Sequence, residues 1–406
     1  MEPHSLPQNT LQLLTSNNEY LESHIPWWRD LGAQARAELC LEPLERGERR
    51  VVDVVVIGGG VAGLSAALSA RAAGAEVLLL EATRGLGRGA TGRNAGILSA
   101  GVNMGIAELP PEGEEAQFWP ETTKVLLNLV EESRQADSLL QTTLTGSLNL
   151  AESVHAARAL AREVRARVAL GTRAELWSPE QVARHTDGRL NTSQVVSAMW
   201  LPDEGRVQPL TLLAHLARRA RAAGAQIVGQ AEVACFAEVA PAGRPAFWSL
   251  VLTSGQSIEA RGLINAVGPT SQPNSRIYAL AFEADLPDTF PLFWDAAPYT
   301  YADYRPGCGR LTVSGGRYGK AGGSGHEASY YRRLVSNARH WLPELATRAP
   351  AYKWSVDLSV SADMVPNLRR LGEHAPGLAI EGLGALGVLP GIVLGQRGGA
   401  QIAARF

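Results

Sequence analysis

VVDVVVIGGGVAG, residues 51–63, is the stretch of this sequence that decides the fold. Five of its first six residues are valine, and such an apolar β-branched run is typical of a strand buried on both faces. Gly58, Gly60 and Gly63 follow at G-x-G-x-x-G spacing. In that pattern the first glycine turns the chain off the strand, the second admits a pyrophosphate, and the third lets the next helix pack close to the sheet.

The residues after these glycines complete a nucleotide-binding pattern. A helix expected over Leu64–Ala73 would direct its free N–H groups and its positive dipole end towards the phosphates. A second strand, Glu76–Leu80, ends at Glu81, whose carboxylate can accept a hydrogen bond from a ribose hydroxyl. Strand, glycines, helix, strand and acid together predict a Rossmann-like βαβ unit within an α/β fold.

The composition is that of a globular protein, and it excludes several function classes. The chain has 406 residues, of which 45% are hydrophobic and 19% charged, enough for two or three domains. Its net charge of −2 creates no field that would attract nucleic acid or anionic lipid. Three isolated cysteines fit a reducing, cytoplasmic compartment. We predict no membrane span and, because the histidines stand apart from carboxylate or cysteine partners, no metal site.

Nucleotide-binding signals recur in three separate segments, so the chain is expected to leave and re-enter one domain. They include a glycine-rich loop at Arg84–Gly101 and an apolar run ending in glycine at Gly262–Gly268. The remaining segments are expected to form an α+β domain on a mixed or antiparallel sheet. Trp27 and Trp28 lie in a leading segment that is expected to wrap over the surface. The predicted division is an N-terminal extension (1–50), a cofactor domain (51–101, 207–272 and 362–406) and a substrate domain (102–206 and 273–361).

Two motifs carry a family resemblance. DVVVIGGGVAGLSAA (residues 53–67) and GATGRNAGIL (residues 89–98) resemble the D-amino-acid oxidase (DAO) superfamily of FAD-dependent oxidoreductases. The nearest likeness is to gamma-glutamylputrescine oxidase-like amine oxidases, and it extends over residues 24–404. The resemblance implies a GR2/DAO-type FAD-binding domain in which the second motif closes over the pyrophosphate of the flavin.

Weaker motifs extend the resemblance along the chain. EGRVQP (204–209) resembles the entry to a helix that returns to the FAD domain, and DYR (303–305) with GRLTVSGG (309–316) resembles strands over the flavin ring. DMVP (363–366) and GLGALGVLPG (382–391) resemble stretches beside that ring. The last loop departs from relatives, because Gly384, Ala385 and Leu386 replace a common Ser-Gly-His.

The resemblance implies a set of cofactor contacts. Asn94 stands where covalent relatives often have histidine, and no cysteine follows Cys308, so we predict non-covalent FAD. The predicted contacts are Gly58, Gly59, Gly60, Val61, Ala62, Gly63, Glu81, Ala82, Gly89, Ala90, Thr91, Arg93, Asn94, Ala95, Gly96, Ile97, Val233, Ala266, Gly268, Gly384, Leu386, Gly387 and Val388.

The resemblance also implies oxidation of a C–N bond in a small-molecule amine or amino acid. A hydride would pass to flavin N5, the imine would hydrolyse, and O₂ or another acceptor would take the electrons. Arg317 suits a substrate carboxylate, Lys320 could sit near N5, and Tyr304 could belong to an aromatic wall beside the flavin. The alternatives are a surface arginine, a solvated lysine and a tyrosine packed in the core.

Two other functions compete with this hypothesis. The apolar last loop favours a catalytically altered flavin-binding subunit that passes electrons to a partner protein or acts as a scaffold. An NAD-linked dehydrogenase would rest on the first motif alone, and the split domain and the GATGRNAG loop argue against it. The sequence leaves a homo-oligomer open.

Overall fold

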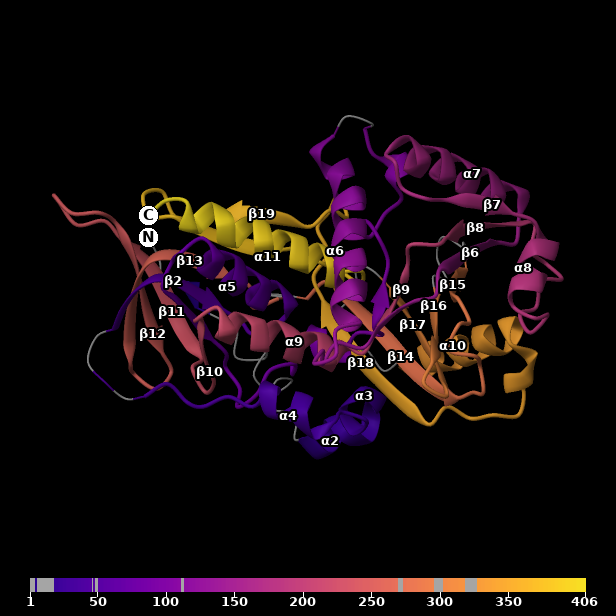
Figure 1. Cartoon of the computed structure of the whole chain (residues 1–406), viewed down its shortest axis with the longest axis horizontal. Coiled ribbons are helices and arrows are strands. Elements are labelled where there is room, and N and C mark those ends of the chain that lie inside the picture. Colours follow the sequence, from indigo (N-terminus) through magenta and orange to yellow (C-terminus); the bar gives the residue numbers. More distant parts are fainter. Residues whose placement is uncertain are drawn as a thin grey trace.

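The protein has two lobes, each built around a β-sheet (Figure 1). The structure, a computed structural model, describes residues 4–5, 18–45, 47, 50–110, 113–268, 273–295, 302–317 and 327–406. The expected α/β class, with a Rossmann-like sheet and a second, mixed sheet, is confirmed.

The first lobe is organised around the valine-rich strand β2 (Arg50–Ile57), which pairs in parallel with β3 and β13. Val54, Val55 and Val56 are fully buried, as the sequence predicts for a central strand. The path along the sheet is β1 (His4–Ser5), β11 (Val233–Val239), β12 (Phe247–Leu252), β13 (Ser257–Asn265), β2, β3 (Val77–Leu80) and β10 (Gln226–Val228); β20 (Gly377–Glu381) also pairs with β13, and β19 (Asn367–Arg370) pairs with β20.

Three helices cover one face of this sheet: α5 (Val61–Ala72), α9 (Pro209–Ala222) and α11 (Val388–Ala403). Helix α5 begins three residues earlier than expected, so that Gly63 lies inside its first turn. Helix α11 has Pro390 in its first turn, where a missing N–H group costs no helical hydrogen bond. Glycines on α11 bring its backbone close to α5, because a Cβ at Gly395 or Gly399 would collide with α5 backbone oxygens.

The second lobe contains the eight-stranded sheet, which is antiparallel except where β15 pairs with β6. Its helices are α7 (Val154–Ala169), α8 (Pro179–His185) and α10 (Glu327–Trp341), whereas α6 (Phe118–Ser133) lies between the lobes and packs against α11. Short 3₁₀ turns lie at Ile106–Glu108, Glu114–Gln117 and Pro343–Leu345. The strand order is β18 (Tyr352–Leu358), β14 (Ser275–Glu283), β17 (Arg310–Arg317), β16 (Ala302–Gly307), β15 (Leu292–Asp295), β6 (Ser147–Ala151), β8 (Ser197–Leu201) and β7 (Glu175–Trp177). A third, three-stranded sheet consists of β4 (Ile97–Leu98), β9 (Gly205–Val207) and β5 (Thr142–Leu144).

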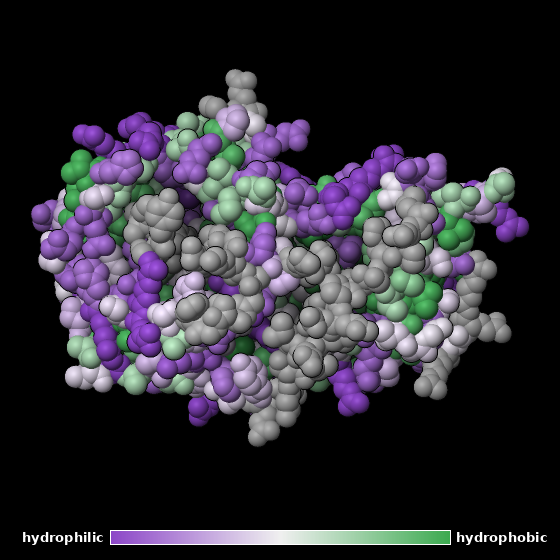
Figure 2. All heavy atoms as spheres, turned by 180° about the vertical axis from the view of Figure 1, so that it is seen from behind, coloured by the Kyte–Doolittle hydropathy of each residue, from purple (hydrophilic) through white to green (hydrophobic). Residues whose placement is uncertain are grey.

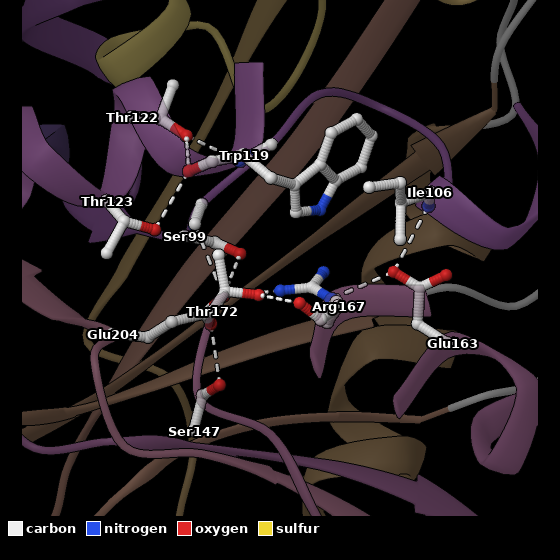
Figure 3. A network of polar contacts seen from close by, with 12 residues as sticks. Ser99, Ile106, Trp119, Thr122, Thr123, Ser147, Glu163, Arg167, Thr172 and Glu204 are labelled. Atoms are coloured by element: carbon white, nitrogen blue, oxygen red, sulfur yellow. Dashed lines mark hydrogen bonds and ion pairs between the residues drawn. The ribbon is translucent and has the colours of Figure 1, made fainter. Parts of the chain in front are cut away.

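A buried polar network surrounds Glu204, the residue before β9, where the chain returns to the first lobe (Figure 3). Its carboxylate accepts hydrogen bonds from Ser99 Oγ at 2.8 Å and Ser147 Oγ at 2.6 Å, and Arg167 lies 3.5 Å away. Burial raises the pKa of Glu204, while Arg167 and the two hydroxyls oppose that shift. The network therefore ties β4, β6 and α7 together at the crossing between the lobes.

The N-terminal segment is integrated into the core. Helices α2 (Asn18–His24), α3 (Pro26–Arg29) and α4 (Ala33–Leu39) contribute to the same hydrophobic cluster as α5, α9 and α11. Trp27 and Trp28 are only 4% and 5% exposed. The segment thus packs more deeply than a surface wrap, because the two indoles reach a loop of the candidate site.

On the face shown in Figure 2, hydrophobic residues form small groups between hydrophilic ones. Among the described helices, none is both long enough and apolar enough to cross a membrane.

Candidate active site

The turn between β2 and α5 forms one end of the candidate site. Gly58 has φ +102°, a conformation that favours glycine, and a Cβ there would lie 2.6 Å from the Ala266 carbonyl oxygen. A Cβ at Gly63 would collide with the Gly58 carbonyl oxygen. The roles expected for the first and third glycines, a sharp turn and close helix packing, thus match the geometry of this turn.

The N-terminus of α5 faces the loop of the second motif, residues 89–98. No side chain caps this helix at Gly60, and the N–H of Val61 donates to Thr91 Oγ1 at 3.3 Å. A Cβ at Gly60 would lie 3.1 Å from the same hydroxyl oxygen. The two sequence motifs therefore meet at a helix N-terminus, which is suited to a phosphate because N–H groups and the helix dipole both favour an anion.

Glu81 follows β3 and is held by the same turn. Its carboxylate accepts the Gly59 N–H at 2.9 Å and the N–H and hydroxyl of Thr83. Burial raises the pKa of Glu81, and these hydrogen bonds oppose the shift. The Ala231 N–H donates to the Glu81 carbonyl oxygen at 3.0 Å, so the segment that leads to Val233 runs beside the end of β3. Val233 itself is buried at the start of β11.

Three tryptophans hold the loop of residues 89–98 from behind. The sequence analysis did not assign them to the site. The indole N–H groups of Trp27 and Trp28 both donate to the Gly92 carbonyl oxygen, at 2.8 and 3.0 Å. Trp354 of β18, whose ring packs edge-on against Trp27 at 5.0 Å between centroids, donates to the Arg93 carbonyl oxygen at 2.8 Å. Because indoles are rigid and buried, these bonds hold the 3₁₀ turn Ala90–Arg93 in one conformation.

Asn103 plays a similar part for the last loop, and sequence reasoning missed it as well. Its side-chain oxygen accepts the N–H groups of Ala385 and Leu386 at 2.9 and 3.1 Å. Its amide donates to the Leu383 carbonyl oxygen at 3.1 Å. A Cβ at Gly384 would lie 2.5 Å from this amide, so the glycine permits the close approach.

These loops and the second sheet enclose one cavity with two walls. The loop wall consists of Val61, Ala90, Thr91, Arg93, Asn94, Ala95, Ile97, Gly268, Ile380, Gly382, Leu383, Gly384, Ala385, Leu386, Gly387 and Val388. The sheet wall consists of Ile277, Ala279, Asp303, Ser314, Val356, Leu358 and Ser359.

The predicted cofactor contacts divide into two groups. Twelve of them belong to the loop wall: Val61, Ala90, Thr91, Arg93, Asn94, Ala95, Ile97, Gly268, Gly384, Leu386, Gly387 and Val388. The others lie around the β2–α5 turn, the ends of β3 and β13 or between the lining residues, outside this cavity: Gly58, Gly59, Gly60, Ala62, Gly63, Glu81, Ala82, Gly89, Gly96, Val233 and Ala266.

Of the three predicted catalytic residues, Tyr304 is the one whose side chain the structure describes. Tyr304 is fully buried on the opposite face of β16, where its ring stacks on Phe293 at 4.4 Å between centroids. This placement corrects the expectation for Tyr304, because side chains alternate along a strand and its neighbour Asp303 faces the cavity instead. Arg317 ends β17, where its backbone pairs with Arg276. Lys320 lies outside the described residues.

The arrangement fits FAD. Absent side chains at Gly58, Gly60 and Gly63 open the turn, the α5 N-terminus offers N–H groups to a pyrophosphate, and Glu81 stands at the end of β3. The cavity begins at Val61 and Thr91, beside that helix end, and continues to the sheet wall. Among the described residues, no group of three or more His, Cys, Asp or Glu side chains could hold a metal ion.

Comparisons with known proteins agree with this geometry. Glycine oxidase from Geobacillus kaustophilus is similar in structure, with a TM-score of 0.71 and 20% identity over 88% of this chain and 95% of that one. L-Proline dehydrogenase from P. horikoshii has a TM-score of 0.69 and 17% identity over 86% of this chain and 93% of that one. L-Amino acid deaminase from Proteus myxofaciens has a TM-score of 0.69 and 15% identity over 91% of this chain and 93% of that one. No curated protein matches in sequence. The family model for FAD dependent oxidoreductases (DAO) matches residues 53–397, so the chain belongs to this family of FAD-dependent oxidoreductases.

Proposed function

We propose that this protein oxidises a C–N bond of a small-molecule amine or amino acid, with FAD held non-covalently by the loop wall. When bound there, FAD would accept a hydride at its N5 atom, and water would hydrolyse the resulting imine. The observation that carries the proposal is the cavity itself, in which loops typical of cofactor binding face a sheet that can hold a second molecule.

The residues of the two walls have different tasks in this proposal. Val61, Thr91 and the free end of α5 would bind the phosphates, and the loop fixed by Asn103 would lie along the ring. Ile277, Val356 and Leu358 of the sheet wall would exclude water and position the substrate. Such positioning contributes to the rate because the reacting atoms are held in contact before reaction.

The similar structures support a C–N substrate. They include oxidases of glycine and iminodiacetate, an L-proline dehydrogenase and L-amino acid deaminases, and one L-α-glycerophosphate oxidase. The apolar last loop, which favours a catalytically altered subunit on sequence grounds, is held in place by Asn103 beside the cavity. No observation on the described residues favours that alternative function.

The test is an anaerobic flavin titration. The protein is purified and its visible spectrum recorded, and a panel of amines and amino acids is then added without oxygen. Bleaching of the flavin bands by at least one compound is the expected result, and reoxidation by air or by an artificial acceptor identifies the acceptor class. If the protein binds FAD but no amine or amino acid bleaches the flavin bands, the proposal is contradicted.

A further inference from the structure

The last loop of the cavity, residues 382–387, is held by a segment that follows the second motif. Residues 99–107, here called the linking segment, come directly after the loop of residues 89–98. Asn103, near the middle of the linking segment, makes three hydrogen bonds to the last loop, at 2.9 to 3.1 Å. Asn103 can hold the last loop in one position only if the linking segment is itself held.

Two buried carboxylates hold the two ends of the linking segment (Figure 3). At one end, Glu204 accepts hydrogen bonds from Ser99 Oγ at 2.8 Å and from the backbone N–H of the next residue at 3.2 Å. At the other end, Glu163 of α7 accepts the backbone N–H groups of Ile106 and of the next residue, at 3.1 and 2.9 Å. The position of Asn103 therefore depends on the positions of these two carboxylates.

Arg167 of α7 joins the two carboxylates. Its Nε donates to Glu163 Oε1 at 2.8 Å, and its Nη1 lies 3.5 Å from Glu204 Oε1. All three residues are buried, with exposed fractions of 7% for Arg167, 8% for Glu163 and 1% for Glu204. Charges at such a depth interact strongly because little water screens them. Because a guanidinium is planar and rigid, Arg167 fixes how far apart the two carboxylates lie.

Stability alone is a weak explanation for this arrangement. Buried ion pairs contribute little net stability, because the cost of removing charges from water offsets their attraction, and apolar side chains of similar volume often replace them without loss. An apolar side chain at position 167 could fill the same space. It could not keep two carboxylates at a fixed separation, so the arrangement points to positioning.

We propose that Arg167 is a positioning residue, which sets the place of the last loop of the cavity through the linking segment and Asn103. Arg167 does not line the cavity, so it acts through these residues and not by contact with cofactor or substrate. The inference rests on the proposed function in one respect, the placement of FAD along the last loop. It goes further because it makes a helix of the second lobe responsible for the position of a cofactor-binding loop.

Hydrogen–deuterium exchange tests this coupling directly. Arg167→Met removes the charge and keeps most of the side-chain volume. In the full-length protein saturated with FAD, the peptide that contains Ala385 and Leu386 should exchange about 10-fold faster in this variant, because their N–H groups lose a fixed acceptor. A peptide from the central strand β2 reports global opening and should change by less than about twofold. Equal acceleration of both peptides, or of neither, overturns the proposal.

Arg165→Met is the matched control. Arg165 lies on the same helix as Arg167 and is exposed, so the substitution removes the same charge from α7 away from the buried carboxylates. Exchange of the last loop should then match that of the wild type within about twofold. An effect as large as that of Arg167→Met would trace the acceleration to the net charge of α7 and would overturn the proposal.

A double-mutant cycle tests whether Arg167 acts through Asn103. FAD affinity is measured by diluting the FAD-loaded protein and recording the fluorescence of released FAD. Arg167→Met should lower this affinity about 10-fold in the wild-type background. It should lower it by less than about twofold when Asn103→Ala has already released the last loop. A loss of the same size in both backgrounds would show that Arg167 acts independently of Asn103.

Failure of this inference can be distinguished from failure of the proposed function. If exchange of the last loop responds as expected but FAD affinity is unchanged, the positioning role stands and the placement of FAD along this loop is wrong. If no amine or amino acid bleaches the flavin, the proposed C–N oxidation fails, and the exchange result still decides the role of Arg167.

Glu163→Gln replaces Arg167→Met in both experiments if the latter does not fold. The single carbonyl oxygen of glutamine takes the place of the two carboxylate oxygens that accept the N–H groups of Ile106 and the next residue. We expect changes in the same direction of about threefold or more, because one of these N–H groups loses its acceptor. Exchange of the last loop at the wild-type rate in this variant overturns the proposal.

Discussion

The two walls of the cavity are built in different ways. Seven of the 16 residues of the loop wall are glycine or alanine, and its loops are fixed by side chains that lie behind them, such as Trp27, Trp28 and Asn103. The sheet wall consists of side chains from four neighbouring strands, β14, β16, β17 and β18. Loop backbone suits a cofactor whose phosphates bind N–H groups, whereas exchangeable side chains suit the selection of a substrate. The difference indicates that cofactor and specificity can change independently.

Gly63→Val should produce the largest effect, on the loop wall. The new side chain would collide with the Gly58 carbonyl oxygen, and backbone on both sides prevents relief. We expect a loss of about 3 kcal/mol in the free energy of unfolding and purification without flavin. Urea denaturation and the ratio of flavin to protein absorbance measure both.

Gly47→Val is the matched control for this change. No atom of the described residues lies within 4 Å of a Cβ at Gly47, so its effect on stability should be below about 0.5 kcal/mol. A Gly63→Val variant that retains full flavin and stability would show that the turn is not as tight as described.

Asn103→Ala should have the second-largest effect, because it releases the last loop of the cavity, residues 382–387. Three hydrogen bonds to Leu383, Ala385 and Leu386 are lost, worth about 2 to 3 kcal/mol together. The variant should lose flavin affinity in a fluorescence titration with FAD. Asn103→Asp keeps both acceptor contacts and should recover part of the loss; equal defects in the two variants would rule out this loop-holding role.

Asp295→Asn tests the electrostatics of the sheet. The folded-state pKa of about 7 lies above the ordinary value of 3.8, so ionisation of Asp295 destabilises the fold. The carboxyl contributes most stability below pH 4 and loses it as pH rises towards 7. Asp295→Asn should therefore match the wild type near pH 4 and gain about 4 kcal/mol relative to it at pH 8, measured by urea denaturation. A relative stability that does not vary with pH would refute the raised pKa.

Trp28→Phe should have the smallest effect. The Gly92 carbonyl oxygen keeps the Trp27 donor, so the single change should cost about 1 kcal/mol or less. The double variant Trp27→Phe, Trp28→Phe removes both indole donors and should cost more than the sum of the two single changes. Additive losses would indicate that the shared acceptor is unimportant and that packing alone explains the effects.

The contrast between the two walls also explains which parts of the site could be predicted from the sequence. Gly58, Gly63 and Glu81 were predictable because only certain residues fit a tight turn or a strand end, and their spacing is local. The side of β16 that faces the cavity could not be predicted. Asp303 and Tyr304 are adjacent in the sequence, and the pleat of the strand decides which of the two side chains lines the cavity. Asn103 was missed because its partners lie 280 to 283 residues away and no local pattern marks such a contact.

The most direct test of the division between the walls is an experimental structure with FAD and n-hexylamine bound after anaerobic reduction. We expect the pyrophosphate at the N-terminus of α5, the flavin ring along Thr91–Ile97 and Leu383–Val388, and the amine against the sheet wall at Val356 and Leu358. A flavin ring that rests against Ile277 and Val356, with the amine held by the loops, would contradict this expectation.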